Sequence, residues 1–200
     1  MKTIVVLVKE VPDPAGLGVS KSKAQIFERE KRIINPADRF ALELALQLKD
    51  RGLARVVTVS VGSHSTSGTL KELYALGADE VILIVTRNEL SRNQIASAIS
   101  NYLLKIDFDI VLAGSYSTIN NLGEVPQRVA AELKLPFKSE ISSVENLEEK
   151  FVATVKPEFS RPRRPSAKMI LLARKKEVRA VELDFELPPA DVMRLSTELP

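Results

Sequence analysis

Two polar stretches, each directly after a run of apolar residues, contain the side chains best suited to bind an anion. Residues Lys9 to Gly18 follow the run Ile4–Val8, and residues Gly114 to Gly123 follow the run Ile110–Ala113. The second stretch carries three serine and threonine hydroxyls and two amides, and leads into a helix that we expect to begin near Glu124. Such a loop and helix N-terminus can place donors on an anionic group. The alternative is a solvated loop before a helix whose dipole Glu124 itself satisfies, in which case that carboxylate repels a phosphate.

Other kinds of chemistry lack the residues that they need. The 200-residue chain has no cysteine and one histidine, His64, so thiolate-bound zinc, iron–sulfur clusters, cysteine nucleophiles and multi-histidine metal centres are excluded. There is no Gly-x-Gly-x-x-Gly, Walker or Gly-x-Ser-x-Gly sequence. We interpret His64, which lies among serines, as a turn residue near a helix start. We therefore expect no catalytic residue and no metal site, and an enzyme is the least favoured class.

The elements that must position the polar stretches alternate between strands and helices. Short runs rich in β-branched residues, apolar throughout, are typical of strands buried on both faces. The four runs are Ile4–Val8, Val56–Val61, Val81–Val85 and Ile110–Ala113. Apolar residues at helical spacing follow each run, within Phe40–Leu48, Leu70–Leu76, Ile95–Leu103 and Val125–Leu133. Four strand–helix pairs in a row predict an α/β fold of three layers, an open and mainly parallel sheet with helices on both faces.

Helix boundaries and the expected ligand crevice follow from the same pattern. Asn35-Pro36 is typical of a helix start, and Gly77 of a helix end. In an open parallel sheet, ligands bind outside the carboxyl ends of the strands, where the strand order reverses. With the order 3-2-1-4-5, that crevice lies between the loops after the first and fourth strands, which are the two polar stretches.

The pattern changes after about residue 136, where the helical spacing fades. All eight glycines lie at or before Gly123, and five of the eleven prolines lie between residues 157 and 189. We predict a nucleotide-binding-type α/β domain over residues 1–155, and a C-terminal extension over residues 156–200 that either completes the same domain or reaches a partner. Candidate strands there are Phe137–Val144, Phe151–Val155, Met169–Leu172 and Val178–Leu183, with a short helix at Ala190–Leu195.

The net charge of +3 conceals a strongly basic segment. Residues 1–155 have 19 basic and 19 acidic side chains, residues 156–179 have nine basic and two acidic, and residues 180–200 have one basic and five acidic. Either the basic and acidic segments neutralise each other in solvent, or the basic segment docks an acidic partner. Nucleic acid is not an expected partner, because Phe159 is the only aromatic residue of the segment.

Several short motifs, in order, resemble the β subunit of electron transfer flavoprotein, a family of the adenine-nucleotide-binding HUP-like (adenine nucleotide alpha hydrolase-like) superfamily. The motifs are Val8-Lys-Glu-Val-Pro-Asp13, Arg32-Ile-Ile-Asn-Pro36 followed by Asp38, Val59-Ser-Val-Gly62, Leu76-Gly-Ala-Asp79, Asp109-Ile-Val-Leu-Ala-Gly114, Arg161-Pro-Arg163 and Ala173-Arg-Lys-Lys176. The chain shows no pattern typical of an export signal, so we expect a cytoplasmic protein. The resemblance implies a non-catalytic subunit. It binds AMP or FAD and pairs with an FAD-carrying α subunit that passes electrons between dehydrogenases and the respiratory chain.

The resemblance also implies which residues contact the nucleotide and the redox partner. The implied nucleotide contacts are Leu7, Asn35, Pro36, Ala37, Asp38, Val61, Gly114, Ser115, Tyr116, Ser117, Thr118, Ile119, Asn120, Asn121, Leu122, Gly123, Glu124 and Val125. The implied docking residues for an acidic redox partner are Pro162, Arg163, Arg164, Ala167 and Lys168.

The chain departs from the family pattern at both places. The family's phosphate loop has a run of aspartates and then Asn-Gln-Thr, whereas these positions here read Ile119-Asn-Asn121 and Gly123-Glu-Val125. The docking tip is the small Ala167, and the chain is about fifty residues shorter than is usual. Two alternatives therefore stay open: a stand-alone adenine-nucleotide binder resembling universal stress proteins, and a scaffold subunit without nucleotide. Self-association into a homodimer in the absence of α is also open, and we expect no membrane span.

Overall fold

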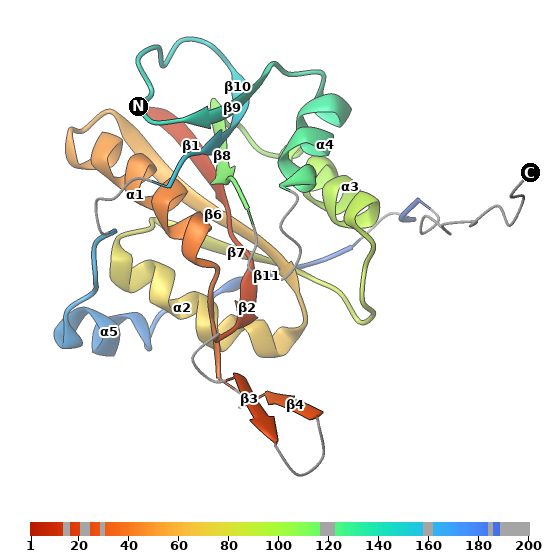
Figure 1. Ribbon diagram of the computed structural model, residues 1–200. Coiled ribbons are helices and arrows are strands. Elements are labelled where there is room, and N and C mark those ends of the chain that lie inside the picture. Colours follow the sequence, from red (N-terminus) through yellow and green to blue (C-terminus); the bar gives the residue numbers. More distant parts are fainter. Residues whose placement is uncertain are drawn as a thin grey trace, which may run out of the picture.

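The fold, seen in a computed structural model, is a seven-stranded parallel sheet with helices on both faces (Figure 1). The structure describes residues 1–13, 17–20, 25–28, 31–116, 123–157, 162–183 and 186–188. The order across the sheet is β11-β7-β6-β1-β8-β10-β9. Its strands are β1 (Lys2–Leu7), β6 (Ala54–Gly62), β7 (Glu80–Val85), β8 (Ile110–Gly114), β9 (Phe137–Ile141), β10 (Phe151–Val155) and β11 (Arg179–Glu182).

The four predicted apolar runs form the centre of this sheet. Strands β7, β6, β1 and β8 lie in the predicted order 3-2-1-4, and every pairing among them is parallel. Successive side chains of each strand enter opposite cores. Val6 and Val56, for example, pack on one face, while Val5 and Val57 pack on the other. Continuous apolar runs are therefore needed, because both faces of each central strand are buried.

Helices cover the two faces in pairs. Helices α1 (Pro36–Asp50) and α2 (Ser67–Leu76) contribute to one core, and α3 (Arg92–Leu103) and α4 (Glu124–Leu133) to the other. Helix α1 begins at Pro36 as predicted, although the side chain of Asn35 makes no capping hydrogen bond. Gly77 ends α2 with a φ of 120°, a conformation that glycine adopts without strain. The three-layer architecture expected from the sequence is thus confirmed.

Beyond β8 the strand order differs from the expected 4-5 continuation. Strand β10 lies beside β8, and β9, which precedes β10 in the chain, lies at the outer edge. All five residues of β10 are buried, whereas β9, with the sequence Phe-Lys-Ser-Glu-Ile, is partly exposed. An apolar strand needs neighbours on both sides, and a strand with charged side chains tolerates the edge. The position in the sheet next to β8 is therefore taken by the more buried strand, β10, and not by β9, which comes next in the chain.

The C-terminal part joins the main body through one strand and one helix. Strand β11 extends the sheet beside β7, close to the expected strand Val178–Leu183. The expected strand Met169–Leu172 is wrong, because these residues lie in helix α5 (Ala167–Ala173), which packs on α2. Ala, Lys, Met and Leu are good helix formers, and the Ser166 hydroxyl caps the helix by accepting a hydrogen bond from the Met169 amide. The expected helix Ala190–Leu195 lies outside the described residues, and the domain division at residue 155 stays a prediction.

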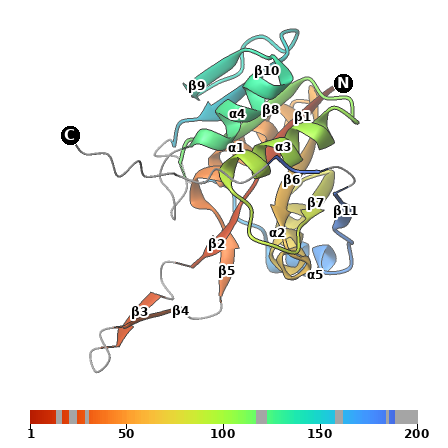
Figure 2. The same cartoon turned by 90° about the vertical axis from the view of Figure 1, so that its right-hand side faces the viewer.

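The stretch after β1 is not the continuous loop that the sequence suggested. Strands β2 (Glu10–Pro12) and β5 (Arg32–Ile34) pair antiparallel, and β3 (Leu17–Ser20) pairs with β4 (Gln25–Glu28). Figure 2 shows the hairpin of β3 and β4 projecting away from the sheet. Within the N-terminal polar stretch, Glu10–Pro12 therefore belong to a separate two-stranded sheet, and Leu17 and Gly18 belong to the projecting hairpin.

Candidate functional site

A cleft of about 700 Å³ lies at the carboxyl ends of β1, β6 and β8. Strand β1 has β6 on one side and β8 on the other, so the strand order reverses at this point. The connections that leave the sheet here diverge to helices on opposite faces and leave a crevice between them. The predicted location of the ligand crevice, between the loops after the first and fourth strands, agrees with this cleft.

The floor of the cleft is held by the side chains of Asn35 and Asp38. Asp38 Oδ2 accepts a hydrogen bond from the backbone amide of Lys9 at 2.7 Å, and Asp38 Oδ1 accepts one from Asn35 Nδ2 at 3.0 Å. The same Asn35 Nδ2 donates to the backbone carbonyl of Tyr116 at 2.9 Å. Both residues are buried. The start of α1 therefore joins the loop after β1 to the loop after β8.

Two glycines, Gly114 and Gly123, lie where backbone segments around the cleft approach each other closely. A Cβ on Gly114 would lie 2.4 Å from Asp38 Oδ1 and 2.7 Å from the carbonyl carbon of Ala37. Gly123 has a φ of +50°, and a Cβ there would lie 2.6 Å from the carbonyl oxygen of Ser115. Only glycine fits at these two positions without displacing backbone.

Burial raises the pKa of Asp38 to about 7. The hydrogen bonds from the Lys9 amide, the Asn35 side chain and the Gly114 amide favour the carboxylate and oppose this shift. The pKa of this carboxyl group thus lies near neutral pH, at the point where the two cleft loops meet.

Basic side chains surround the cleft. Lys9, Arg32, Arg87 and Arg92 all line it and are exposed. Partial burial of the Lys9 ammonium against the cleft lowers its pKa, Asp38 opposes this shift, and Arg92 adds to it. Exposed cations of this kind can attract a phosphate group.

Glu124 is the acidic counterpart at the start of α4. It lies in the first turn, as predicted, and its Oε2 accepts a hydrogen bond from Arg92 Nη1 at 3.0 Å. Because Arg92 is bound to Glu124, its charge is already partly neutralised before an anion binds. A ligand phosphate would therefore compete with Glu124 for Arg92.

The walls of the cleft combine apolar side chains with one unsatisfied hydroxyl. Leu7, Val61, Ile95 and Ile99 provide apolar surface of the kind that accepts a flat ring. Ser60 is 2% exposed, and its hydroxyl has no hydrogen-bond partner within the described parts of the chain. Buried polar groups are normally satisfied, so a polar ligand atom or a water is expected there. Apolar walls, an orphan hydroxyl and surrounding cations fit an adenine nucleotide.

The structure brings nine of the eighteen predicted nucleotide contacts together at the cleft. The residues that line the cleft are Leu7, Asn35, Asp38, Val61, Gly114, Tyr116, Gly123, Glu124 and Val125. Pro36, Ala37 and Ser115 lie beside it without lining it. Residues Ser117, Thr118, Ile119, Asn120, Asn121 and Leu122 lie outside the described residues.

Sequence reasoning missed a third wall of the cleft, the loop after β7. Residues Thr86 to Leu90 line the cleft, together with Gly62 at the end of β6 and Ser63, Ser65 and Thr66 after it. The polar sequence Thr-Arg-Asn-Glu directly after a buried strand was the available signal. The carboxyl ends of parallel strands meet at one edge, so a polar loop after any central strand can reach the same crevice.

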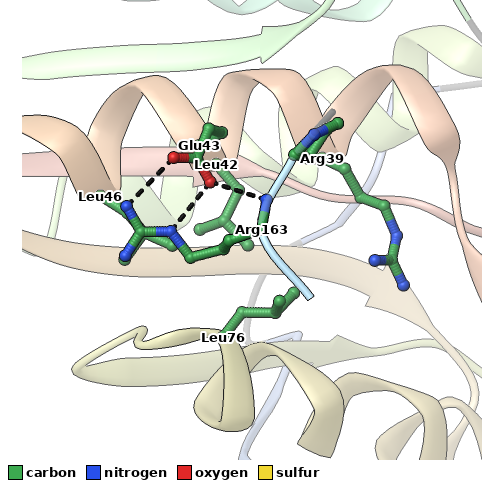
Figure 3. A pocket seen from close by; sticks show the side chains of 7 residues that line it. Arg39, Leu42, Glu43, Leu46, Leu76 and Arg163 are labelled. Atoms are coloured by element: carbon green, nitrogen blue, oxygen red, sulfur yellow. Dashed lines mark hydrogen bonds and ion pairs between the residues drawn. The ribbon is translucent and has the colours of Figure 1, made fainter. Parts of the chain in front are cut away.

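Arg163, one of the predicted docking residues, binds the protein's own helix α1. Its Nε donates to Glu43 Oε2 at 2.9 Å, one Nη2 bond reaches Glu43 Oε1 at 3.1 Å, and another reaches Asp50 Oδ2 at 2.8 Å. Figure 3 shows the fork of the arginine around Glu43, beside Leu46. The surrounding pocket, which Pro162 also lines, has no room for a water molecule. Arg163 thus anchors the segment, whereas Arg164, Ala167 and Lys168 are exposed.

The other candidate groups add no second site. His64 lies in a short 3-10 helix before α2, and its Nε2 lies 3.6 Å from Glu182 Oε1 with both side chains exposed. Among the described residues, no three His, Asp or Glu side chains are grouped as for a metal ion. Within the same residues, no helix is long and apolar enough to cross a membrane.

The chain is similar in sequence to known electron transfer proteins. Residues 24–161 match the electron transfer flavoprotein domain. The chain is 34% identical over 145 residues to electron transfer flavoprotein subunit beta of Clostridium acetobutylicum, covering 71% of this chain and 56% of that relative. It is 31% identical over 196 residues to the same subunit of Syntrophomonas wolfei, covering 83% and 78%. It is also 32% identical over 139 residues to acryloyl-CoA reductase electron transfer subunit gamma of Anaerotignum propionicum, covering 66% and 52%.

Proposed function

The chain belongs to the electron transfer flavoprotein family, where it is β-like, and from this premise we propose that it binds an adenine nucleotide, AMP or FAD, in the cleft at β1 and β8. The observation that carries the proposal is the cleft itself, placed where the strand order reverses. Its apolar walls suit the adenine ring, and the unsatisfied Ser60 hydroxyl and the cations around Arg92 suit the polar part of a nucleotide. FAD would supply redox chemistry, whereas AMP would be a structural ligand.

The protein pairs with an FAD-carrying α-type subunit and transfers electrons without being an enzyme itself. Curated relatives of similar sequence are named as electron transfer subunits, which supports this role. The chain has no cysteine, so a bound flavin is the redox group that this role needs. We place the protein in the cytoplasm, with an acidic redox partner facing the basic C-terminal segment.

Identification of the bound small molecule tests the proposal. The protein, purified with whatever subunit accompanies it, is denatured by heat, and the supernatant is examined by absorption and mass spectrometry. We expect AMP, or FAD with its yellow colour, at close to one molecule per β-like chain beyond the FAD that α carries. A supernatant without this nucleotide overturns the binding proposal and favours the scaffold alternative, while ATP favours the stand-alone binder.

A pair of matched variants assigns the nucleotide to the cleft. Val61→Trp places a large ring in the cleft, whereas Leu104→Trp makes a similar change at an exposed position, 73% accessible, on the end of α3. We expect Val61→Trp to lose most of the bound nucleotide and Leu104→Trp to keep it. Equal loss in both variants, or none in either, contradicts the proposed location.

A further inference from the structure

Glu10 is an acidic residue of the cleft that forms no ion pair within the described parts of the chain. It lies in β2, lines the cleft and is half-buried. Three other acidic residues line the cleft among the described residues. Asp38 is bound to a backbone amide, and Glu124 is bound to Arg92. Glu89 is exposed. Glu10 is therefore the half-buried carboxylate that remains for a ligand.

The carboxylate of Glu10 is held in place from two sides. Its backbone pairs with Ile34 in the two-stranded sheet of β2 and β5, and its Oε2 accepts a hydrogen bond from Thr66 Oγ1 at 3.1 Å. Thr66 is 5% exposed, so its hydroxyl has little freedom to move. A Cβ on Gly62 would lie 2.8 Å from this hydroxyl, and glycine leaves room for it. Among the described residues nothing bonds Glu10 Oε1, which stays available to a ligand.

The side of the cleft that contains Glu10 is opposite the side that suits a phosphate. Thr66 is the N-cap residue of α2, and α2 contacts β5, the partner strand of β2. Arg92 begins α3, and α2 and α3 belong to the cores on opposite faces of the sheet. A nucleotide with its phosphate near Arg92 therefore presents the far end of its base to Glu10.

The chemistry of a carboxylate restricts what can meet Glu10. An ionised carboxylate accepts hydrogen bonds and donates none, so its partner on the ligand must be a donor. Phosphate oxygens carry negative charge and are repelled. The edge of adenine offers an exocyclic amino group, which is a donor, whereas hypoxanthine has a carbonyl oxygen at the same position. A carboxylate at the base end of the cleft thus favours adenine over hypoxanthine.

From these observations we propose that Glu10 determines the base specificity of the cleft by accepting a hydrogen bond from the exocyclic amino group of adenine, with Thr66 as its positioning residue. The inference rests on the proposed function, because it needs a nucleotide in the cleft, and it deepens that function by naming the residue that selects the base. Neither residue is among the nucleotide contacts that the family resemblance implies. AMP and FAD share this amino group, so the inference holds for both.

Comparison of AMP with IMP, in which a carbonyl oxygen replaces the amino group, tests the inference. Calorimetry on the purified protein, with whatever subunit accompanies it, gives the Kd of each nucleotide. We expect the Kd of IMP to be higher by about tenfold or more, because a hydrogen bond to a charged group is lost and the carbonyl faces a carboxylate. Equal Kd values for the two nucleotides overturn the inference.

Three variants assign this preference to Glu10. Glu10→Gln keeps the shape but can donate as well as accept, so the ratio of the IMP and AMP Kd values should fall to about twofold or less. Thr66→Val removes the positioning hydroxyl and should lower the ratio partway. Glu89→Gln removes the same charge from another cleft-lining position and should keep the wild-type ratio. The ratio cancels general effects of charge on the phosphate, which both nucleotides carry. An unchanged ratio in Glu10→Gln, or an equal fall in Glu89→Gln, overturns the inference.

Deoxy analogues of AMP separate the base from the ribose as the partner of Glu10. We expect Glu10→Gln to leave the Kd values of 2′-deoxyAMP and 3′-deoxyAMP unchanged relative to that of AMP. If Glu10→Gln instead removes a preference for a ribose hydroxyl and leaves the IMP ratio intact, Glu10 binds the sugar and the inference is wrong. Binding of AMP without preference over IMP contradicts this inference alone, whereas binding of neither nucleotide contradicts the proposed function as well.

Discussion

The carboxylate of Asp38 accepts a hydrogen bond from the backbone amide of Lys9 at 2.7 Å, across the point where the strand order of the sheet reverses. Asn35 extends this connection to the carbonyl of Tyr116. The two polar side chains of the Asn-Pro-x-Asp segment are therefore occupied by the protein's own backbone. In the proposed nucleotide site, their contribution would be to hold the loops after β1 and β8 at a fixed separation.

Stability should fall as the pH rises toward neutrality, because the pKa of Asp38 is about 7 in the folded protein and that of an unfolded aspartate is about 4. The folded state then binds more protons than the unfolded state between these values, so ionisation of Asp38 destabilises the fold. The loss amounts to about 2 kcal/mol between pH 5 and pH 7. Chemical denaturation at a series of pH values measures it.

Asp38→Asn provides the control for this pH dependence. The amide cannot ionise, so the part of the pH dependence that belongs to Asp38 should disappear. Near pH 5 the variant should be less stable than the wild type by about 1–3 kcal/mol, since an amide nitrogen replaces one of two accepting oxygens. This difference should shrink as the pH rises toward 7, because only the wild type loses stability there. A pH profile identical to that of the wild type would show that Asp38 does not titrate in this range.

Gly114→Ala should destabilise the protein and weaken nucleotide binding, because the added Cβ would lie 2.4 Å from Asp38 Oδ1 and 2.7 Å from backbone atoms. We expect a cost of about 2–3 kcal/mol, the range for overpacking against backbone. Gly68→Ala is the matched control. Nothing lies within 4 Å of a Cβ on Gly68 in α2, so alanine there should stabilise the helix by about 0.5–1 kcal/mol. Thermal unfolding of both variants measures the difference, and similar melting temperatures would contradict it.

Glu124→Gln should strengthen AMP binding. The substitution removes the negative charge that Arg92 now faces at 3.0 Å and leaves the arginine to the ligand. Charge pairs that are this exposed contribute little, so the expected gain is about threefold to tenfold in Kd by calorimetry. Glu132→Gln makes the same change farther along α4, where the side chain bonds Ser97, and should have no effect. An unchanged affinity for Glu124→Gln would show that this carboxylate does not compete with phosphate.

Arg163→Ala should loosen the C-terminal segment from α1. Burial of Glu43 favours its neutral form, but hydrogen bonds from Arg163 outweigh this effect and lower the pKa of Glu43. A carboxyl group with a lowered pKa stabilises the fold above its unfolded pKa, and this stabilisation is lost as the pH falls through the folded pKa. The variant should therefore lose about 1 kcal/mol near pH 7 and less in acid.

Arg164→Ala is the neighbouring control, since Arg164 is exposed. It should change the free energy of unfolding by less than about 0.5 kcal/mol. Limited proteolysis between residues 157 and 179 should accelerate in Arg163→Ala alone. Equal cleavage of the two variants would contradict an anchoring role for Arg163.

The central architecture could be predicted because strands that are buried on both faces need apolar residues at every position, and such runs are visible in the sequence. Apolar runs such as Val81–Val85 are buried on both faces, so the sequence itself indicates a parallel sheet. Local composition failed at Met169–Leu172, where four apolar residues suggested a strand. The residues form an exposed helix instead, and apolar composition alone does not distinguish a short strand from a short helix.

The chain by itself determined the alternation of strands and helices, the 3-2-1-4 order of the central strands and the edge at which a ligand would bind. These features depend on hydrophobic spacing and on the handedness of crossovers, which are properties of the local chain. Tertiary structure decided the use of particular polar groups. It placed β10 between β8 and β9 in the sheet and added the loop after β7 to the cleft. It also directed the side chains of Asn35, Asp38 and Arg163 to partners within the chain. Sequence could not show these pairings, because a hydrogen bond between residues 81 or 120 positions apart depends on where the whole fold brings their backbones.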